Sequence, residues 1–211
     1  MQRILVTGFE GFGGRKDNPS AEVATALNGT GFENSIVVSR VLPVTNHDLQ
    51  SNLIKLLEEL KPAVVLCLGL SAGESVVRIE RLAANYSRFD IADNAGERYC
   101  GCVVADGPAA YETTLPVDAM LAAVNRCGIP ARLSNSAGAY LCNALMYHAL
   151  HYSVTSKADY ISGFVHLPYM PSQVCDIMSR ENGAIDTSSL SSMSLDDQKR
   201  AVIEIIRCID A

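Results

Sequence analysis

The sequence predicts an α/β fold with three layers, α/β/α, in which helices cover both faces of a mostly parallel central sheet. Two observations lead to this prediction. Short apolar segments of strand length alternate with amphipathic segments of helix length through most of the 211 residues. Several of the apolar segments are continuously hydrophobic, as in strands that are covered on both faces. We see no repeat or linker, so we expect one domain spanning residues 1–211.

The predicted elements alternate between strand and helix through most of the chain. In order, they are strand 3–7, a helix from 19, strand 35–41, helix 45–60, strand 63–68, a strand-like segment within 76–85, helix 117–126, strand 131–135, helix 140–152, strand 160–167 and a last helix after the serine-rich loop 187–193. The segment 69–107 departs from the alternation because it is rich in glycine and charge. We therefore expect mostly loop there.

Helix boundaries are marked by capping residues and prolines. Asn18 is a good N-cap, and Pro19 suits the first helical position, where a missing N–H costs nothing. Pro62 ends the helix 45–60, because proline cannot continue a helix. Ser194 and Asp197 resemble a capping box at the start of the last helix, with Asp in place of the usual Glu.

Composition excludes several classes of function. A net charge of −6 argues against nucleic acid or an anionic membrane as partner. We find no signal peptide and no apolar run of transmembrane length. The seven cysteines include no C-x-x-C pair and no zinc-ligand spacing. We therefore expect a cytoplasmic protein with reduced thiols.

Cys142 is the leading candidate for a catalytic residue. It lies in SAGAYLCN (136–143), between a predicted strand and a predicted helix. A thiol at a helix start feels the positive end of the helix dipole, which favours the nucleophilic thiolate. The alternative is a small core residue, since free cysteine is often buried.

A general base for Cys142 is sought among four histidines. His47 begins a helix in polar surroundings, and His148 and His151 lie further along the helix that follows Cys142. His166 ends a buried strand, so it is placed to meet Cys142 across the sheet edge. A core histidine bonded to the backbone is the alternative.

Glu80 is the candidate that would orient the imidazole of His166. Strand alternation places it on a partly buried face. A surface ion pair with Arg78 or Arg81 is the other interpretation. Asp93 and Asp106 are further candidates, but both lie in turn-like segments that explain them without catalysis.

The loop 8–14 carries glycines and two phenylalanines after the first strand. Its spacing does not fit the dinucleotide-binding pattern G-x-G-x-x-G, and bulky Phe9 and Phe12 occupy it. Aromatic side chains on such a loop are more typical of the walls of a small apolar pocket.

Short motifs along the whole chain resemble the pyroglutamyl-peptidase I (pyrrolidone-carboxylate peptidase) family. They are LVTGFEGFGG (5–14) with NPS (18–20), LPV (42–44), ERLAAN (80–85), DNAG (93–96), LP (115–116), SAGAYLCN (136–143), GFVHLPY (163–169) and MSLD (193–196). Each motif is short, but together they keep the family's order and approximate spacing.

The resemblance implies a cysteine peptidase, a hydrolase that removes N-terminal pyroglutamate from peptides through a thioester, with no cofactor. It implies Cys142 as nucleophile, His166 as base and Glu80 as the orienting acid. It further implies a substrate pocket formed by Phe9, Phe12, Asn18, Leu70 and Leu141. An intracellular homo-oligomer, a tetramer or dimer, is expected from the family.

The sequence departs from the family at three places. Asp90-Ile91-Ala92 stands where Arg-Ile-Pro is common, so an arginine near the site is missing unless Arg88 replaces it. Leu70 stands where bacterial members often have Gln, and Gly11 where they have Pro. These departures leave two alternatives open: a weakened or non-catalytic binder of pyroglutamyl termini, and a thiol amidohydrolase for another small amide.

Overall fold

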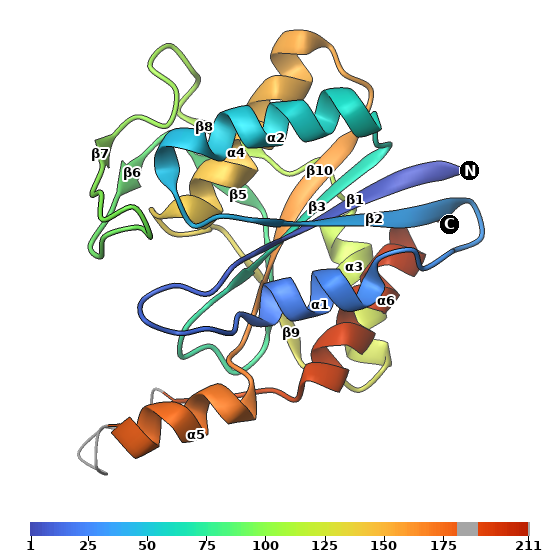
Figure 1. Cartoon of the computed structure of the whole chain (residues 1–211). Helices are drawn as coiled ribbons and strands as arrows, with labels where there is room; N and C mark the ends of the chain where they lie inside the picture. The colour runs from blue at the N-terminus through green and yellow to red at the C-terminus, as the bar shows by residue number, and fades with distance from the viewer. Residues whose placement is uncertain (181–189, 211) are drawn as a thin grey trace.

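The fold is organised around a six-stranded sheet, as seen in a computed structural model that describes residues 1–180 and 190–210. The strand order is β2-β1-β3-β10-β4-β9 (Figure 1). The strands are β1 (Gln2–Phe9), β2 (Ser35–Leu42), β3 (Val64–Leu70), β4 (Val77–Glu80), β9 (Ala131–Ser134) and β10 (Ile161–Leu167). The predicted α/β fold with a mostly parallel sheet is confirmed.

Two strands run against the other four. β1, β2, β3 and β10 are mutually parallel, whereas β4 pairs antiparallel with β10 and β9 pairs parallel with β4. The connection from β3 to β4 is too short for the crossover that a parallel strand needs. β9 therefore does not end at the same edge of the sheet as β1, β3 and β10.

Helices cover both faces of the sheet, as predicted. α2 (Asn46–Leu60) and α4 (Leu141–Ser156) lie on one face, and α1 (Pro19–Leu27), α3 (Val117–Arg126) and α6 (Leu195–Asp210) lie on the other (Figure 1). A further helix, α5 (Pro171–Arg180), lies at one end of the molecule (Figure 1) and was not predicted. The sheet thus has an apolar core on each side.

Two small strand pairs lie in and just beyond the segment 69–107. β5 (Leu82–Ala84), which falls within the predicted strand-like segment 76–85, pairs with β8 (Ala110–Glu112), and β6 (Ser87–Arg88) pairs with β7 (Cys100–Gly101). Both pairs are antiparallel and lie beside the start of α4 (Figure 1). Strands of two or three residues give no readable alternation, which is why the sequence pattern did not reveal these pairs.

The predicted caps are found at two helix starts. The side chain of Asn18 accepts a hydrogen bond from Ser20 N at 3.1 Å, and Pro19 is the first residue of α1. At α6, Asp197 N donates to Ser194 Oγ at 3.1 Å, but Ser194 Oγ donates in turn to the Asp197 carboxylate. Only half of a capping box therefore forms. The predicted serine-rich loop 187–193 lies partly outside the described residues.

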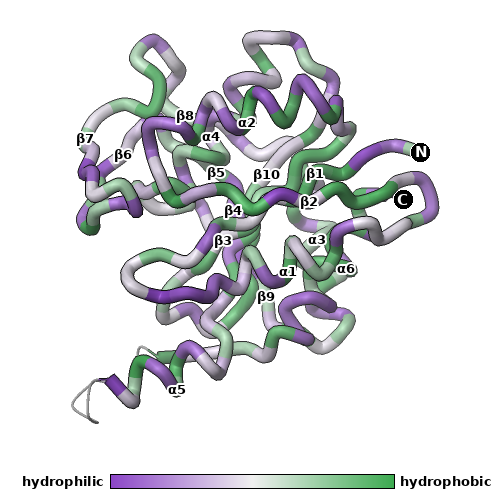
Figure 2. Tube along the Cα trace, viewed as in Figure 1, coloured by the Kyte–Doolittle hydropathy of each residue, from purple (hydrophilic) through white to green (hydrophobic). Residues whose placement is uncertain are grey.

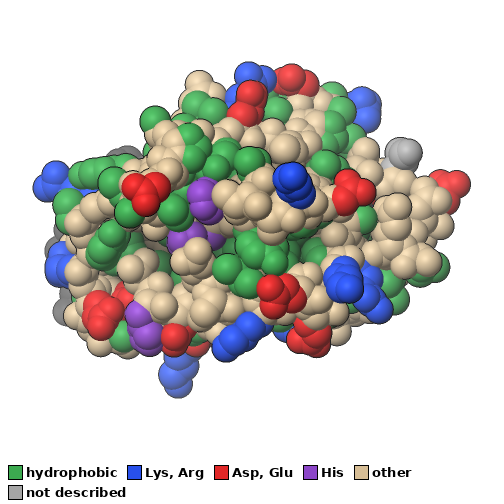
Figure 3. All heavy atoms as spheres, turned by 90° about the horizontal axis from the view of Figure 1, so that it is seen from above, with side chains coloured by type: hydrophobic (Ala, Val, Ile, Leu, Met, Phe, Trp, Pro, Cys, Tyr) green, Lys and Arg blue, Asp and Glu red, His purple; other side chains and the backbone are tan. Residues whose placement is uncertain are grey.

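Hydropathy follows the layers. The central strands β1, β3 and β10 are mostly hydrophobic, whereas hydrophilic and hydrophobic residues alternate along α2 (Figure 2). The face seen in Figure 3 mixes acidic and basic side chains with apolar ones rather than gathering one sign of charge. Among the described residues, no helix combines the length and apolar character needed to cross a membrane.

Candidate active site

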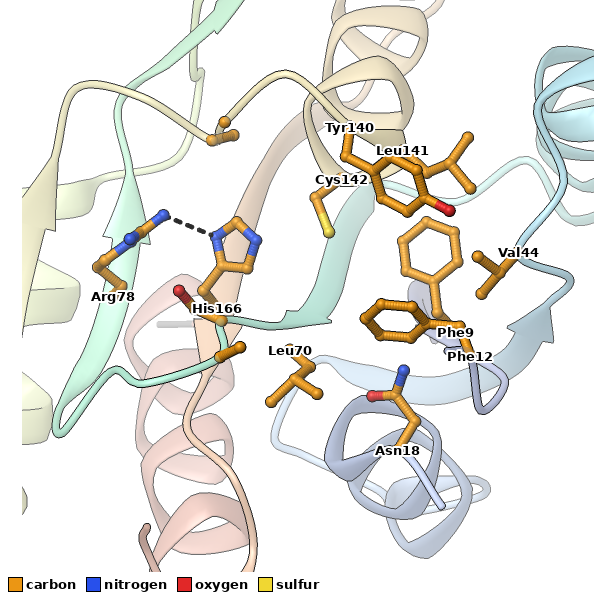
Figure 4. A pocket seen from close by; sticks show the side chains of 14 residues that line it. Phe9, Phe12, Asn18, Val44, Leu70, Arg78, Tyr140, Leu141, Cys142 and His166 are labelled. Carbon is orange, nitrogen blue, oxygen red and sulfur yellow. Dashed lines mark hydrogen bonds between the residues drawn. The ribbon is translucent and has the colours of Figure 1, made fainter. Parts of the chain in front are cut away.

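A largely apolar cavity of about 210 Å³ lies where β1, β3 and β10 end and α4 begins. All five residues of the predicted substrate pocket line it, and so do Cys142 and His166. Figure 4 shows these side chains around one space, with the aromatic residues on one side and His166 on the other. The cavity therefore brings together segments from both ends of the chain.

Cys142 lies in the first turn of α4. Its N-cap, Tyr140, provides no side-chain cap, so the first N–H groups of this helix have no partner within it. The sulfur lies against Gly69 of β3, where an added Cβ would be 2.8 Å from Sγ. A nucleophile at this position thus has helix N–H groups beside it that can hold a developing oxyanion.

His166 and Glu80 form a buried hydrogen-bonded pair. His166 Nδ1 lies 2.8 Å from Glu80 Oε1, and the two side chains are 4% and 0% exposed. The antiparallel pairing of β10 with β4 produces this contact between residues far apart in sequence. Because the carboxylate accepts from Nδ1–H, Nε2 is left without a proton and free to accept one.

Burial and neighbouring charges set the ionisation of this pair. Burial lowers the pKa of His166 below its ordinary value, although the hydrogen bond and charge of Glu80 oppose the shift. Burial opposes ionisation of Glu80, but the hydrogen bonds from His166 and Arg78 outweigh it and lower the pKa of that carboxyl. At neutral pH the site therefore holds a neutral imidazole beside a carboxylate.

The thiol of Cys142 behaves differently from the sequence-based expectation. Burial, with the nearby Glu80 charge, raises its pKa to about 12, and the charge of Arg78 only partly offsets this. Burial thus favours the neutral thiol, which opposes the effect expected of the helix dipole. A thiol kept neutral in this way has to lose its proton during attack.

The ring pocket combines apolar walls with one amide. Phe9 and Leu141 are buried, and the ring of Phe12 lies 6.3 Å from that of Tyr140. Asn18 uses Oδ1 for Ser20 and one Nδ2 hydrogen for Glu10 O, so one N–H remains. Leu70 adds an apolar side chain where a Gln would be polar. The pocket suits a small neutral ring with few hydrogen bonds.

The alternative candidates lie elsewhere. Asp93 accepts hydrogen bonds from backbone N–H groups of its own turn and of Asn46, which is a structural role. His47 is solvent-exposed beside Asp48. Arg88 lies 3.6 Å from the exposed carboxylate of Asp90, and neither lines the cavity. Arg88 thus does not replace the arginine missing at position 90.

Two residues that line the cavity were not singled out from the sequence. The ring of Tyr140 packs at a tilt against that of Phe89, with centroids 4.5 Å apart, and forms a third aromatic wall. Arg78 contacts both Glu80 and His166, and the pair it forms with Glu80 is buried rather than on the surface. The sequence could have revealed the position of Arg78, because residues i and i+2 of a strand share a face and Arg78 lies two residues before Glu80.

Substitution of Gly69 by alanine is expected to impair catalysis more than folding. The new Cβ would stand 2.7 Å from Phe164 Cζ and 2.8 Å from Cys142 Sγ, so the sulfur must move. We expect kcat to fall about tenfold, because small misplacements of reacting groups are costly. The free energy of unfolding should fall by only about 1–2 kcal/mol.

Turnover and urea unfolding measure the two effects. Gly31→Ala is the matched control, because nothing lies within 4 Å of its added Cβ. Unchanged kcat in Gly69→Ala would contradict the placement of the sulfur.

Comparison with known proteins identifies the family of this chain. A family model described as pyroglutamyl peptidase matches residues 2–210. The chain belongs to the pyroglutamyl peptidase family. The resemblance seen in its motifs is thereby confirmed.

Members of the pyroglutamyl peptidase family resemble the chain over nearly its whole length. Pyrrolidone-carboxylate peptidase of Pyrococcus furiosus is 41% identical over 201 residues, covering 95% of this chain and 96% of that protein. The Escherichia fergusonii enzyme of the same name is 39% identical, covering 89% and 87%. A crystal structure of a pyrrolidone carboxyl peptidase variant from P. furiosus superposes with a TM-score of 0.92, 39% identity and coverage of 98% and 97%.

Proposed function

We propose that this protein is a cysteine peptidase that removes an N-terminal pyroglutamyl residue from peptides. The observation that supports it most strongly is the shared cavity, which is lined by a helix-start cysteine, an aromatic pocket and His166, whose imidazole is hydrogen-bonded to the buried Glu80 behind it. Membership of the pyroglutamyl peptidase family points to the same reaction. A non-catalytic binder is disfavoured, since binding alone requires no such pair.

Cys142 acts as the nucleophile in the proposed mechanism. His166 Nε2 takes the thiol proton as Sγ attacks the pyroglutamyl carbonyl carbon, and the new C–S bond gives a tetrahedral oxyanion. Helix N–H groups at the start of α4 stabilise that oxyanion. Its collapse breaks the C–N bond, and His166 gives its proton to the leaving amine.

Water completes the cycle. His166 removes a proton from the water that attacks the thioester, and Cys142 leaves as thiolate and is reprotonated. Glu80 remains ionised throughout, holds the imidazole by Nδ1 and stabilises its transient positive charge. These steps require only groups that line or adjoin the cavity.

The cavity explains a preference for pyroglutamate over an ordinary N-terminus. A pyroglutamyl ring is a neutral lactam, whereas other termini carry an ammonium that the apolar walls would leave unpaired. Phe9, Phe12 and Leu70 line the cavity and provide those walls, and in this proposal the remaining N–H of Asn18 donates to the lactam carbonyl. Burying an unpaired charge is costly, so discrimination rests on rejection as much as on attraction.

The proposal extends to assembly and location. By resemblance to the family, we propose a homo-oligomer, a tetramer or dimer, that acts in the cytoplasm. Light scattering of the purified chain measures its oligomeric state, and fractionation of cells measures its location.

The freshly reduced protein is expected to release coumarin from pyroglutamyl-coumarin amide. Prolyl-coumarin amide is the matched control substrate, since it has the same ring size but a charged amine and no lactam carbonyl. We expect at least about a hundredfold higher kcat/KM for the pyroglutamyl substrate. Saturable binding without turnover would instead indicate a binder, and equal or better cleavage of a glutaminyl amide would indicate a different amidohydrolase.

A further inference from the structure

Arg78 adjoins the proposed catalytic pair without belonging to it. It lies on β4, two residues before Glu80, so both side chains project from the same face of that strand. It is also directly opposite His166 in the antiparallel pairing of β4 with β10. The backbone register thus places one guanidinium beside both members of the pair.

The contacts of Arg78 converge on the groups that move the proton. Its Nε donates to Glu80 Oε1 at 2.8 Å, the same oxygen that accepts from His166 Nδ1. Its Nη2 lies 3.5 Å from His166 Nδ1 and donates to Ser136 O at 3.3 Å (Figure 4). The side chain therefore links Glu80 to the turn that leads into Cys142.

We propose that Arg78 is a positioning residue, which holds the Glu80 carboxylate against His166 and supplies positive charge that tunes proton transfer between Cys142 and His166. Its side chain is 17% exposed and lines the cavity. The kinetic part of this inference rests on the proposed function, whereas the effect on the thiol does not.

The positive and negative side chains around the His166–Glu80 pair nearly balance one another. His166 is faced by Arg78 and Glu80 of β4, by Glu74 of the preceding loop and by Cys142 of α4. Glu74 pairs with Arg78 at 3.4 Å and with Arg132 of β9 at 2.7 Å, and Cys67 of β3 lies near Cys142 as a neutral thiol. Arg78 is the cation of this group that touches the proposed catalytic pair.

The sign of the expected pH effect follows from these charges. Arg78 lowers the pKa of His166 and of Cys142, and Glu80 raises both. Removing the guanidinium should raise both pKa values. The acid limb of the kcat/KM profile should then move to higher pH, because His166 keeps its proton to higher pH and cannot act as base.

The test compares Arg78→Met, Arg78→Lys and the control Arg132→Met. For Arg78→Met on pyroglutamyl-coumarin amide, we expect kcat about tenfold lower, KM within about twofold and the acid limb about one pH unit higher. Arg78→Lys keeps the positive charge and should return the acid limb of the kcat/KM profile to its wild-type pH. Arg132→Met removes the same charge from the other side of Glu74 and should leave the profile in place. Arg78→Gln, which keeps an N–H donor, is the substitute if the Met variant folds poorly.

A second measurement needs no turnover. Alkylation of Cys142 by iodoacetamide at a fixed pH, followed by mass spectrometry of its peptide, reports the thiol directly, and its rate should fall in Arg78→Met because less of the thiol is ionised. Rates and pH profiles of Arg78→Met that coincide with wild type would overturn the inference, and so would a change in KM alone, which indicates a substrate contact. Absence of wild-type turnover with slower alkylation of Cys142 in Arg78→Met would refute the proposed function and support the role of Arg78.

Discussion

Cys142→Ala should abolish release of coumarin from pyroglutamyl-coumarin amide, with a loss of about 10⁵-fold or more. No covalent intermediate can form without Sγ, and no other cysteine lies with His166 on the described walls of the cavity. Cys142→Ser should be nearly as inactive, because a serine hydroxyl ionises even less readily than the Cys142 thiol, although burial raises the pKa of that thiol. Initial rates with highly concentrated enzyme measure this loss.

The control for this variant is Cys175→Ala, which removes an exposed thiol on α5, away from the cavity. It should retain wild-type rates. Melting temperatures of both variants should stay within a few degrees of wild type, since only one small side chain is shortened. Substantial turnover by Cys142→Ala would refute the proposed nucleophile.

Glu80→Gln is expected to lower kcat about 10³-fold. The neutral amide cannot stabilise the imidazolium that forms during attack. Its NH₂ group can also donate to His166 Nδ1, which places the proton on Nε2, where the base must be free. Single-turnover kinetics with the same substrate measure the loss, because they separate chemistry from product release.

Glu74→Gln is the matched control for that variant. It neutralises a carboxylate that also pairs with Arg78 but makes no hydrogen bond to His166. We expect at most a few-fold loss of kcat there. In Glu80→Gln, Arg78 keeps its pair with Glu74, so the free energy of unfolding should fall by less than the roughly 3–5 kcal/mol that breaking a buried pair costs. Equal losses of activity in the two variants would contradict the orienting role of Glu80.

Much of the fold was predictable because the signals are local. Helix α3 was predicted with the observed boundaries, and Asn18 and Pro19 mark the start of α1 as expected. Elements whose signals are weak were missed. The short pairs formed by β5 to β8 lack periodicity, and the reversed direction of β4 and β9 depends on which strands become neighbours.

The candidate site shows the same division. Cys142, His166 and Glu80 were selected from residue type, position on predicted elements and family motifs, and the structure brings them to one cavity or its immediate border. Their catalytic roles stay predictions until the variants are measured. Arg78 was weighed only as a surface partner of Glu80, because a strand pattern shows a shared face but not its depth.

The sequence by itself determined the class of fold, the helix-start position of Cys142 and the apolar character of the pocket residues. These properties depend on neighbours within a few positions along the chain. Only the tertiary structure decided that Glu80 and His166 meet across β4 and β10, and that burial raises the thiol pKa where the helix dipole alone would lower it. Ionisation depends on water and charge in three dimensions, and those are set by segments far apart in sequence.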